Sequence, residues 1–205
     1  MSTRLPVVLA ITGASGAPYA VRLLQQLAQH EVPVWLIVSG HGWRLLQTES
    51  DISSVHELRV HVGDSQFDAH VKVFDDGDRG AAPASGSARN AGMVICPCSM
   101  GTVAAIAHGT SRSLVERSAD VALKERRKLL LVPRETPMSL IHLENLAQVT
   151  RAGGTIIPAA PGFYHRPTQI SDLVDFVVAR VLDHLDVEHT LGKRWTGTEP
   201  MPGAG

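Results

Sequence analysis

The sequence predicts an α/β protein with a doubly wound parallel sheet, covered by helices on both faces. Short apolar runs, the pattern typical of strands buried on both sides, recur at 7–11, 33–38, 92–97, 128–132 and 155–158. Segments with apolar residues at helical spacing follow these runs, so that strand and helix alternate. Such βαβ units have right-handed crossovers, which place the carboxyl ends of all strands at one edge. A chain of 205 residues fits a single domain of this kind.

The stretch from Val7 to Leu27 predicts a strand, a turn of small residues and a helix. The run 7–11 is followed by small residues at 12–16, and apolar residues then return at helical spacing up to Leu27. Pro18 falls in the first helical turn, where its missing N–H costs nothing. The free N–H groups of a helix start attract anions, most often phosphate. Gly13 and Gly16 do not complete a dinucleotide fingerprint, so a tight turn that only permits close packing is the alternative.

The remaining segments extend the same alternation. We expect helices at 43–49, 103–107, 113–124, 139–151 and 170–185. The segment 98–102 is expected to be a turn after the third strand. Two segments are ambiguous, because 51–60 is compatible with a helix and 71–74 with a short strand. The stretch 75–90 has no periodicity and is expected to be a long loop, which in a compact domain usually has a function or is disordered.

Polar and small residues gather where the predicted strands end. Ser15, Ser39, 99–102 and 134–135 all lie in the turns that follow predicted strands. Ligands of doubly wound sheets bind at the edge formed by these strand ends. Four such turns at one edge favour a phosphate-bearing ligand more strongly than the first turn alone.

Composition excludes several classes of function. A net charge of −1 gives no basis for binding nucleic acid or an anionic membrane surface. No apolar run approaches the ~20 residues needed to cross a bilayer, and the first residues lack a signal-peptide pattern, so we expect a cytoplasmic protein. Cys96 and Cys98 match neither a CxxC redox motif nor a zinc site and are expected to be small buried side chains. The scattered histidines lack ligand spacing, so no metal is predicted.

Several blocks of sequence together resemble the UbiX-type flavin prenyltransferases. The blocks are GAS at 13–15, PCSMGT at 97–102, ERSADVALKERRKLLLVPRETP at 116–137, HLEN at 142–145, PAAPGFYHRP at 158–167 and DLVDFVVARVLD at 172–183. The resemblance implies a flavodoxin-like or Rossmann-like three-layer sandwich over 1–190. The tail at 191–205 would close over a site or contact a neighbouring subunit.

The resemblance also implies an activity and its partners. The family attaches a dimethylallyl group from dimethylallyl phosphate to N5 of reduced FMN, without a metal. It then closes a fourth ring at C6, and the product serves UbiD-type decarboxylases. Members are homododecamers whose active sites are shared between subunits.

The resemblance also implies roles for individual residues. The residues expected to bind FMN are Gly13, Ala14, Ser15, Ser39, Ser99, Met100, Gly101, Thr102 and Arg134. Those expected to bind the prenyl donor are Arg117, Lys124, Tyr164, Arg180 and Trp195, and the catalytic set is Ser15, Glu49, Lys124, Glu135 and Tyr164.

The chemistry of these side chains agrees with the implied roles. Breaking an allylic C–O bond leaves negative charge on phosphate, which Arg117, Lys124 and Arg180 could stabilise. Ring closure requires removal of a proton, for which Glu49 and Ser15 form a natural pair. Each residue also has an ordinary structural explanation: a solvated charged helix face, an exposed ion pair, or packing.

One departure from the family pattern and two alternative functions stay open. Arg79 occupies a position where some relatives have a tryptophan beside the prenyl group. FMN-dependent cysteine decarboxylases share the fold, but the stretch 137–142 lacks the Asn and Trp of their motif. A non-enzymatic flavin-binding subunit of a decarboxylase would not need the second phosphate site that Tyr164 and Arg180 suggest.

Overall fold

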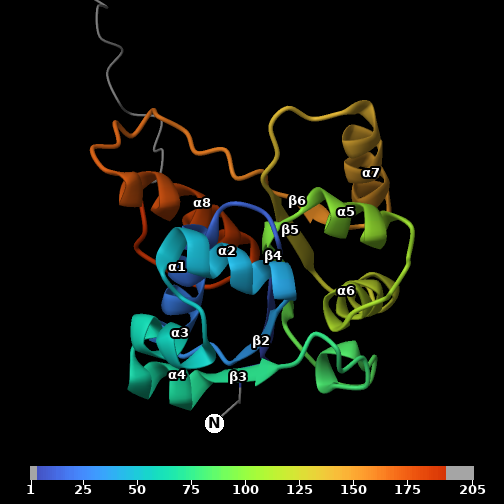
Figure 1. The fold of residues 1–205 in the computed structure, drawn as a ribbon, viewed down its shortest axis with the longest axis horizontal. Helices are drawn as coiled ribbons and strands as arrows, with labels where there is room; N and C mark the ends of the chain where they lie inside the picture. The colour runs from blue at the N-terminus through green and yellow to red at the C-terminus, as the bar shows by residue number, and fades with distance from the viewer. Residues whose placement is uncertain (1–3, 193–205) are drawn as a thin grey trace, which may run out of the picture.

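A six-stranded sheet forms the centre of the computed structural model, which describes residues 4–192 (Figure 1). All neighbouring strands pair in parallel, in the order β3-β2-β1-β4-β5-β6. The strands are β1 (Val7–Ile11), β2 (Val34–Val38), β3 (Val71–Phe74), β4 (Gly92–Cys98), β5 (Leu129–Pro133) and β6 (Thr155–Ile156). This order is typical of the Rossmann arrangement, in which the chain starts at the centre and builds outward on both sides. The predicted doubly wound sheet is therefore confirmed.

Helices cover both faces of the sheet. One face carries α1 (Ala17–Gln29), α2 (Gly40–Ser50), α3 (Val55–Val62), α4 (Asp64–His70) and α8 (Ile170–His184). The other carries α5 (Met100–Ala107), α6 (Leu114–Lys124) and α7 (Leu140–Arg151). A short 3₁₀ turn, η1 (Ala82–Ala84), interrupts the long loop before β4. None of the helices in this part of the chain is long and apolar enough to cross a membrane.

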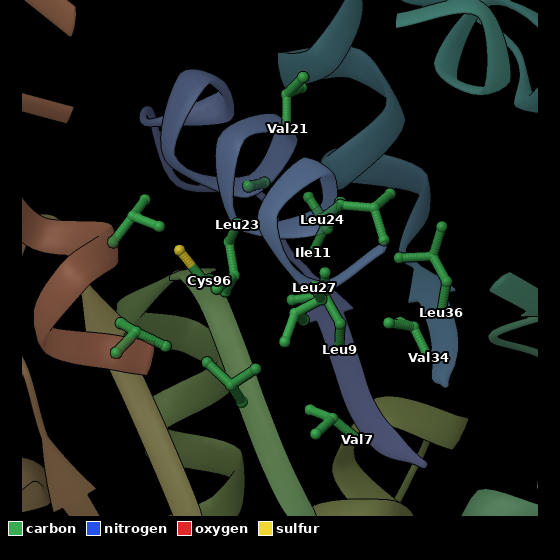
Figure 2. Packing of buried hydrophobic residues seen from close by; sticks show 14 of the residues in the cluster. Val7, Leu9, Ile11, Val21, Leu23, Leu24, Leu27, Val34, Leu36 and Cys96 are labelled. Carbon is green, nitrogen blue, oxygen red and sulfur yellow. The ribbon is translucent and has the colours of Figure 1, made fainter. Parts of the chain in front are cut away.

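The central strands are apolar throughout because each contributes to two cores. Successive side chains of a strand point to opposite faces. Leu9 and Ile11 accordingly join the α1 side of the core, whereas Val8 and Ala10 join the α5 side. Figure 2 shows Leu24 and Leu27 of α1 packed over β1, and Leu23 beside Cys96 at the end of β4. Strands β1, β4 and β5 are buried along their whole length, which explains the continuous apolar runs.

Three details of the predicted helices were wrong. Helix α2 begins at Gly40 rather than at residue 43, and α5 begins at Met100, so that the expected turn at 98–102 is largely helix. In both cases a serine caps the helix. A glycine is tolerated in the first turn, because the N–H groups there have no partner within the helix. Helix α4 was not predicted, because its seven residues contain a single buried apolar side chain, Phe67. The ambiguous segments resolve as α3 and β3.

Candidate functional site

The order of the strands reverses between β1 and β4, and the turns after these two strands are joined directly. The hydroxyl of Thr12, at the end of β1, donates to the carbonyl oxygen of Pro97 at 3.0 Å and accepts from the backbone N–H of Ser99 at 2.9 Å. Thr12 is 2% exposed. Ligands of open α/β sheets bind at such a reversal, outside the carboxyl ends of the strands. The structure thus places the turns at 12–16 and 98–102 side by side at the expected edge.

The start of α5 presents backbone donors at this reversal. Ser99 is the cap, and its Oγ accepts from the N–H of Thr102 at 3.2 Å and lies 3.0 Å from the Thr102 hydroxyl. Met100 is buried, whereas Gly101 is exposed, so the backbone can be approached closely. N–H groups in the first helical turn have no partner within the helix and lie at its positive end. This set of donors fits a phosphate group.

A second capped helix starts next to the first turn. The Oγ of Ser39 accepts from Gly42 N–H at 3.1 Å, and the N–H of Ser39 donates to Ile11 O at 3.0 Å. The two turns pack so closely that a Cβ on Gly13 would lie 2.5 Å from the Cβ of His41, and one on Gly42 would lie 2.4 Å from Ile11 O. Glycine at these positions is therefore required by packing between the turns.

The start of α1 is occupied by a side chain of the protein itself. Oε2 of Glu49, near the end of α2, accepts from the N–H groups of Gly16 and Ala17, both at 2.8 Å. Partial burial on its own would raise the pKa of Glu49, but these two N–H bonds, the Ser15 hydroxyl and the charge of Arg134 together lower it below its ordinary value. Glu49 is thus a carboxylate at neutral pH, in contact with Ser15.

Two further predicted residues lie at the same edge, after β5. Arg134 is exposed, and its Nε donates to the backbone oxygen of Ser15 at 3.2 Å. Glu135 accepts from Thr136 N–H at 3.1 Å. Together with Ser15 and Glu49, these residues place two carboxylates, one hydroxyl and one guanidinium around the reversal point.

A separate pocket of about 390 Å³ lies along the outer side of α8. Tyr164 and Arg180 both line it, as predicted for one binding site, and Phe176 contributes an aromatic wall. The ring centroids of Tyr164 and Phe176 are 5.7 Å apart in an edge-to-face arrangement, and His165 stacks on Phe176 at 5.4 Å. An apolar wall beside a guanidinium suits a small phosphate ester with an apolar tail.

Lys124 is not part of either group within one chain. It ends α6, five residues before β5 starts, and so lies near the amino ends of the strands, at the opposite edge from Ser15. Its amino group pairs with Glu125 and approaches Gly86, where a Cβ would be 3.0 Å from the Lys124 Nζ. The nearby Arg127 donates to the carbonyl oxygens of Gly86 and Ala88 and fixes this loop against α6.

Arg117, another predicted donor-binding residue, stands apart from these groups. Arg117 pairs with Asp120 of its own helix at 2.7 Å. Trp195 lies outside the described residues. Within 4–192, no group of three or more His, Cys, Asp or Glu side chains is placed to hold a metal ion. The prediction that Cys96 and Cys98 are buried is confirmed, and burial raises the pKa of both thiols, that of Cys96 to about 12.

Sequence reasoning missed several residues that organise the site. Thr12 was treated only as a small turn residue, and His189 was weighed only as a metal ligand and rejected on its spacing. No site role was predicted for Arg127 or Asp183. A Thr directly after a buried strand signals a hydroxyl at the binding edge, so Thr12 could have been found. The contacts of Arg127 join segments about 40 residues apart and depend on the folded chain. Asp183 and His189 contact residues only two to six positions away, at the end of α8.

Comparisons with known proteins identify the family. The model of the Flavoprotein family matches residues 1–182. The flavin prenyltransferase UbiX of Alkalihalophilus pseudofirmus is 49% identical over 203 residues, covering 95% of this chain and 99% of the relative. AnUbiX (PadA1), solved in complex with FMN and dimethylallyl pyrophosphate, superposes with a TM-score of 0.88 at 41% identity and covers 96% of this chain and 100% of that one.

A dodecameric FMN-dependent UbiX-like decarboxylase from Escherichia coli O157:H7 gives a TM-score of 0.86 at 40% identity, with 94% of this chain and 100% of that chain covered. Cysteine decarboxylases such as TvaF, at 14% identity, share the fold alone. The high identity over almost the whole chain agrees with the motifs at the carboxyl edge of the sheet. The chain therefore belongs to the UbiX family of flavin prenyltransferases.

Proposed function

We propose that this chain is a flavin prenyltransferase. It transfers a dimethylallyl group from dimethylallyl phosphate to N5 of reduced FMN and closes a fourth ring at C6, giving prenylated FMN. The observation that carries this proposal is the contact of Ser15 and Glu49 beside two capped helix starts, in a chain 49% identical to a UbiX enzyme. A mere FMN carrier needs the helix starts but not the carboxylate and hydroxyl pair.

FMN fits the donors at the point where the strand order reverses. Its phosphate would be held at the start of α5 by Ser99, Gly101 and Thr102 and by the charge of Arg134. Bound FMN supplies the nucleophilic nitrogen and the ring carbon that the prenyl group joins. Because Glu49 occupies the start of α1, that helix does not offer its first N–H groups to the flavin phosphate.

The donor site lies along α8. When the allylic C–O bond of dimethylallyl phosphate breaks, phosphate leaves with the electron pair, and its added negative charge requires fixed cations. Arg180 supplies one, and Tyr164 offers a hydroxyl from the same pocket. The aromatic rings of Tyr164 and Phe176 face the apolar prenyl group, whose developing positive charge is favourable next to a π face.

Ring closure adds a proton to the double bond of the prenyl group and removes one from flavin C6, and Ser15 and Glu49 would move the proton from C6. The Ser15 hydroxyl already donates to Glu49, so that a proton taken by the serine oxygen can pass to the carboxylate. The hydrogen bonds from Gly16 and Ala17 orient Glu49 for this role. Glu135 and Arg134 border the same space and set its charge.

The complete site would combine several copies of the chain. Lys124 lies near the opposite edge of the sheet from Ser15, so within one chain it cannot reach the reacting atoms. A second copy could supply Lys124 and Arg117. Exposed apolar residues support association, since Leu140 and Ile141 of α7 are 69% and 68% exposed and Phe163 is 69% exposed. We propose a homododecamer, as described for the Escherichia coli relative, and a UbiD-type decarboxylase as the recipient of the product.

The test is anaerobic incubation of the protein with reduced FMN and dimethylallyl phosphate, followed by mass spectrometry of the released flavin. We expect a mass gain of one C5 prenyl unit. Because ring closure does not change the mass, Glu49→Gln should retain FMN and the C5 mass gain but stop at the open N5 adduct, whose absorption spectrum differs from that of the four-ring product. Glu31→Gln, at an exposed site just after α1, is the matched control. If the wild-type protein binds FMN and returns it unmodified with both the monophosphate and the diphosphate donor, the proposal is wrong.

A further inference from the structure

The guanidinium of Arg180 is held by a carboxylate that is itself fixed by a buried histidine. Nη1 of Arg180 donates to Oδ2 of Asp183 at 2.9 Å, one turn further along α8. Oδ1 of the same carboxylate lies 3.1 Å from Nε2 of His189. The side chains become steadily less exposed along this series, from 54% for Arg180 to 22% for Asp183 and 2% for His189.

The backbone determines which nitrogen of His189 carries the proton. Nδ1 of His189 accepts from the backbone N–H of Leu191 at 3.1 Å. A nitrogen that accepts a hydrogen bond carries no proton, so the proton of the neutral ring is on Nε2. Nε2–H therefore donates to Asp183, and the imidazole fixes one carboxylate oxygen while the other remains with Arg180.

From this geometry we infer that Asp183 and His189 are positioning residues for Arg180, and that through them the chain after α8 controls the phosphate site. The inference rests on the proposed function, because it assigns Arg180 to the phosphate of the prenyl donor. Arg180 has five N–H donors, and the contact with Asp183 occupies one nitrogen, which leaves the rest of the guanidinium to face the pocket.

The segment that carries His189 is itself anchored to the fold. Val187 and Leu191 pack against the same core as α1 and α8. The ring of His189 thus has a fixed position relative to α8. Through Asp183, it also fixes the position of Arg180. A long and half-exposed arginine loses less side-chain entropy on binding phosphate when a partner already holds it. We expect this arrangement to lower the KM for the donor and to leave kcat almost unchanged.

The experiment compares two substitutions of His189, each of which keeps one of its two hydrogen bonds. In His189→Gln, the side-chain N–H can replace Nε2–H and still donate to Asp183. In His189→Asn, the shorter amide can accept from Leu191 but does not reach the carboxylate. His184→Asn, an exposed histidine of α8, is the matched control. Binding of dimethylallyl phosphate is measured by calorimetry on the FMN-loaded protein, together with KM and kcat.

We expect His189→Asn to raise both Kd and KM for the donor about 10-fold, as for loss of a hydrogen bond to a charged group, with kcat within about 2-fold. His189→Gln and His184→Asn should remain close to the wild type. Asp183→Asn, which removes the charge that Arg180 contacts, should reproduce the effect of His189→Asn. FMN affinity and melting temperature are the folding controls, because the flavin donors lie in other turns.

The outcomes separate the two proposals. If the wild type binds the donor and both His189→Asn and Asp183→Asn bind it equally well, the inference is wrong and the proposed function stands. Equal loss in the Gln and Asn variants would also overturn it, since the contact with Asp183 would then not be what matters. Absence of donor binding by the wild type would overturn the proposed function, and the inference with it.

Discussion

Replacing Thr12 by valine tests whether the two central turns depend on one buried hydroxyl. Valine has nearly the same shape but cannot accept the N–H of Ser99 or donate to Pro97. The N–H of Ser99 would lose the side-chain acceptor seen here, at a cost of about 1–3 kcal/mol. The oxygen of Pro97 keeps a bond from the Thr12 N–H at 3.2 Å, so it loses only about 0.5–1.5 kcal/mol.

We therefore expect Thr12→Val to lower the free energy of unfolding by about 2–4 kcal/mol. For a chain of this size, such a loss reduces the melting temperature by about 4–16 °C. The measurement is thermal unfolding followed by circular dichroism, at one protein concentration and without FMN, because ligand and oligomer both shift the transition. Thr12→Ser, which keeps the hydroxyl, is the control. A valine variant as stable as the wild type would refute the reasoning that this hydroxyl joins the turns.

Three further predictions concern the same edge of the sheet. Because the pKa of Glu49 is lowered in the fold, its contribution to stability is present above its unfolded pKa and is lost as the pH falls through the folded value. The free energy of unfolding of Glu49→Gln should accordingly depend less on pH in the acid range than that of the wild type. Gly42→Ala should destabilise by about 2 kcal/mol or more, because its Cβ would lie 2.4 Å from Ile11 O, whereas Gly40→Ala, with open space around it, should be neutral in urea titrations. Cys96, with a pKa of about 12, should resist alkylation at pH 8 until the protein unfolds, and rapid labelling of the native protein would contradict its burial.

The strands could be predicted from sequence because both their faces are buried. A strand such as β1 must be apolar at every position, and this signal does not depend on knowing its neighbours. The start of α5 was missed because Gly101 suggested a turn, although Ser99 supplies the cap. Short helices such as α4 have too few buried residues to give a recognisable helical spacing of apolar residues in the sequence.

The site was predictable only in part, for a similar reason. Parallel strands must end at one edge, so Ser15, Ser39 and Ser99 could be placed near one another from the chain order alone. The contact of Glu49 with the start of α1 joins residues more than 30 positions apart and depends on how α2 packs. The edge at which Lys124 lies also follows from the chain order, because a helix that ends just before a parallel strand ends at the amino edge of the sheet. Its spacing along α6 alone did not show this.

The distance between Lys124 and Glu49 has a genetic consequence. If each active centre takes these two residues from different copies, a Lys124→Ala chain and a Glu49→Gln chain damage different halves of the same centre. Oligomers formed from equal amounts of the two inactive chains would then contain about a quarter of centres with both native residues. Mixing two inactive proteins, after dissociation and reassembly, would restore activity, and two mutant alleles in one cell would complement each other.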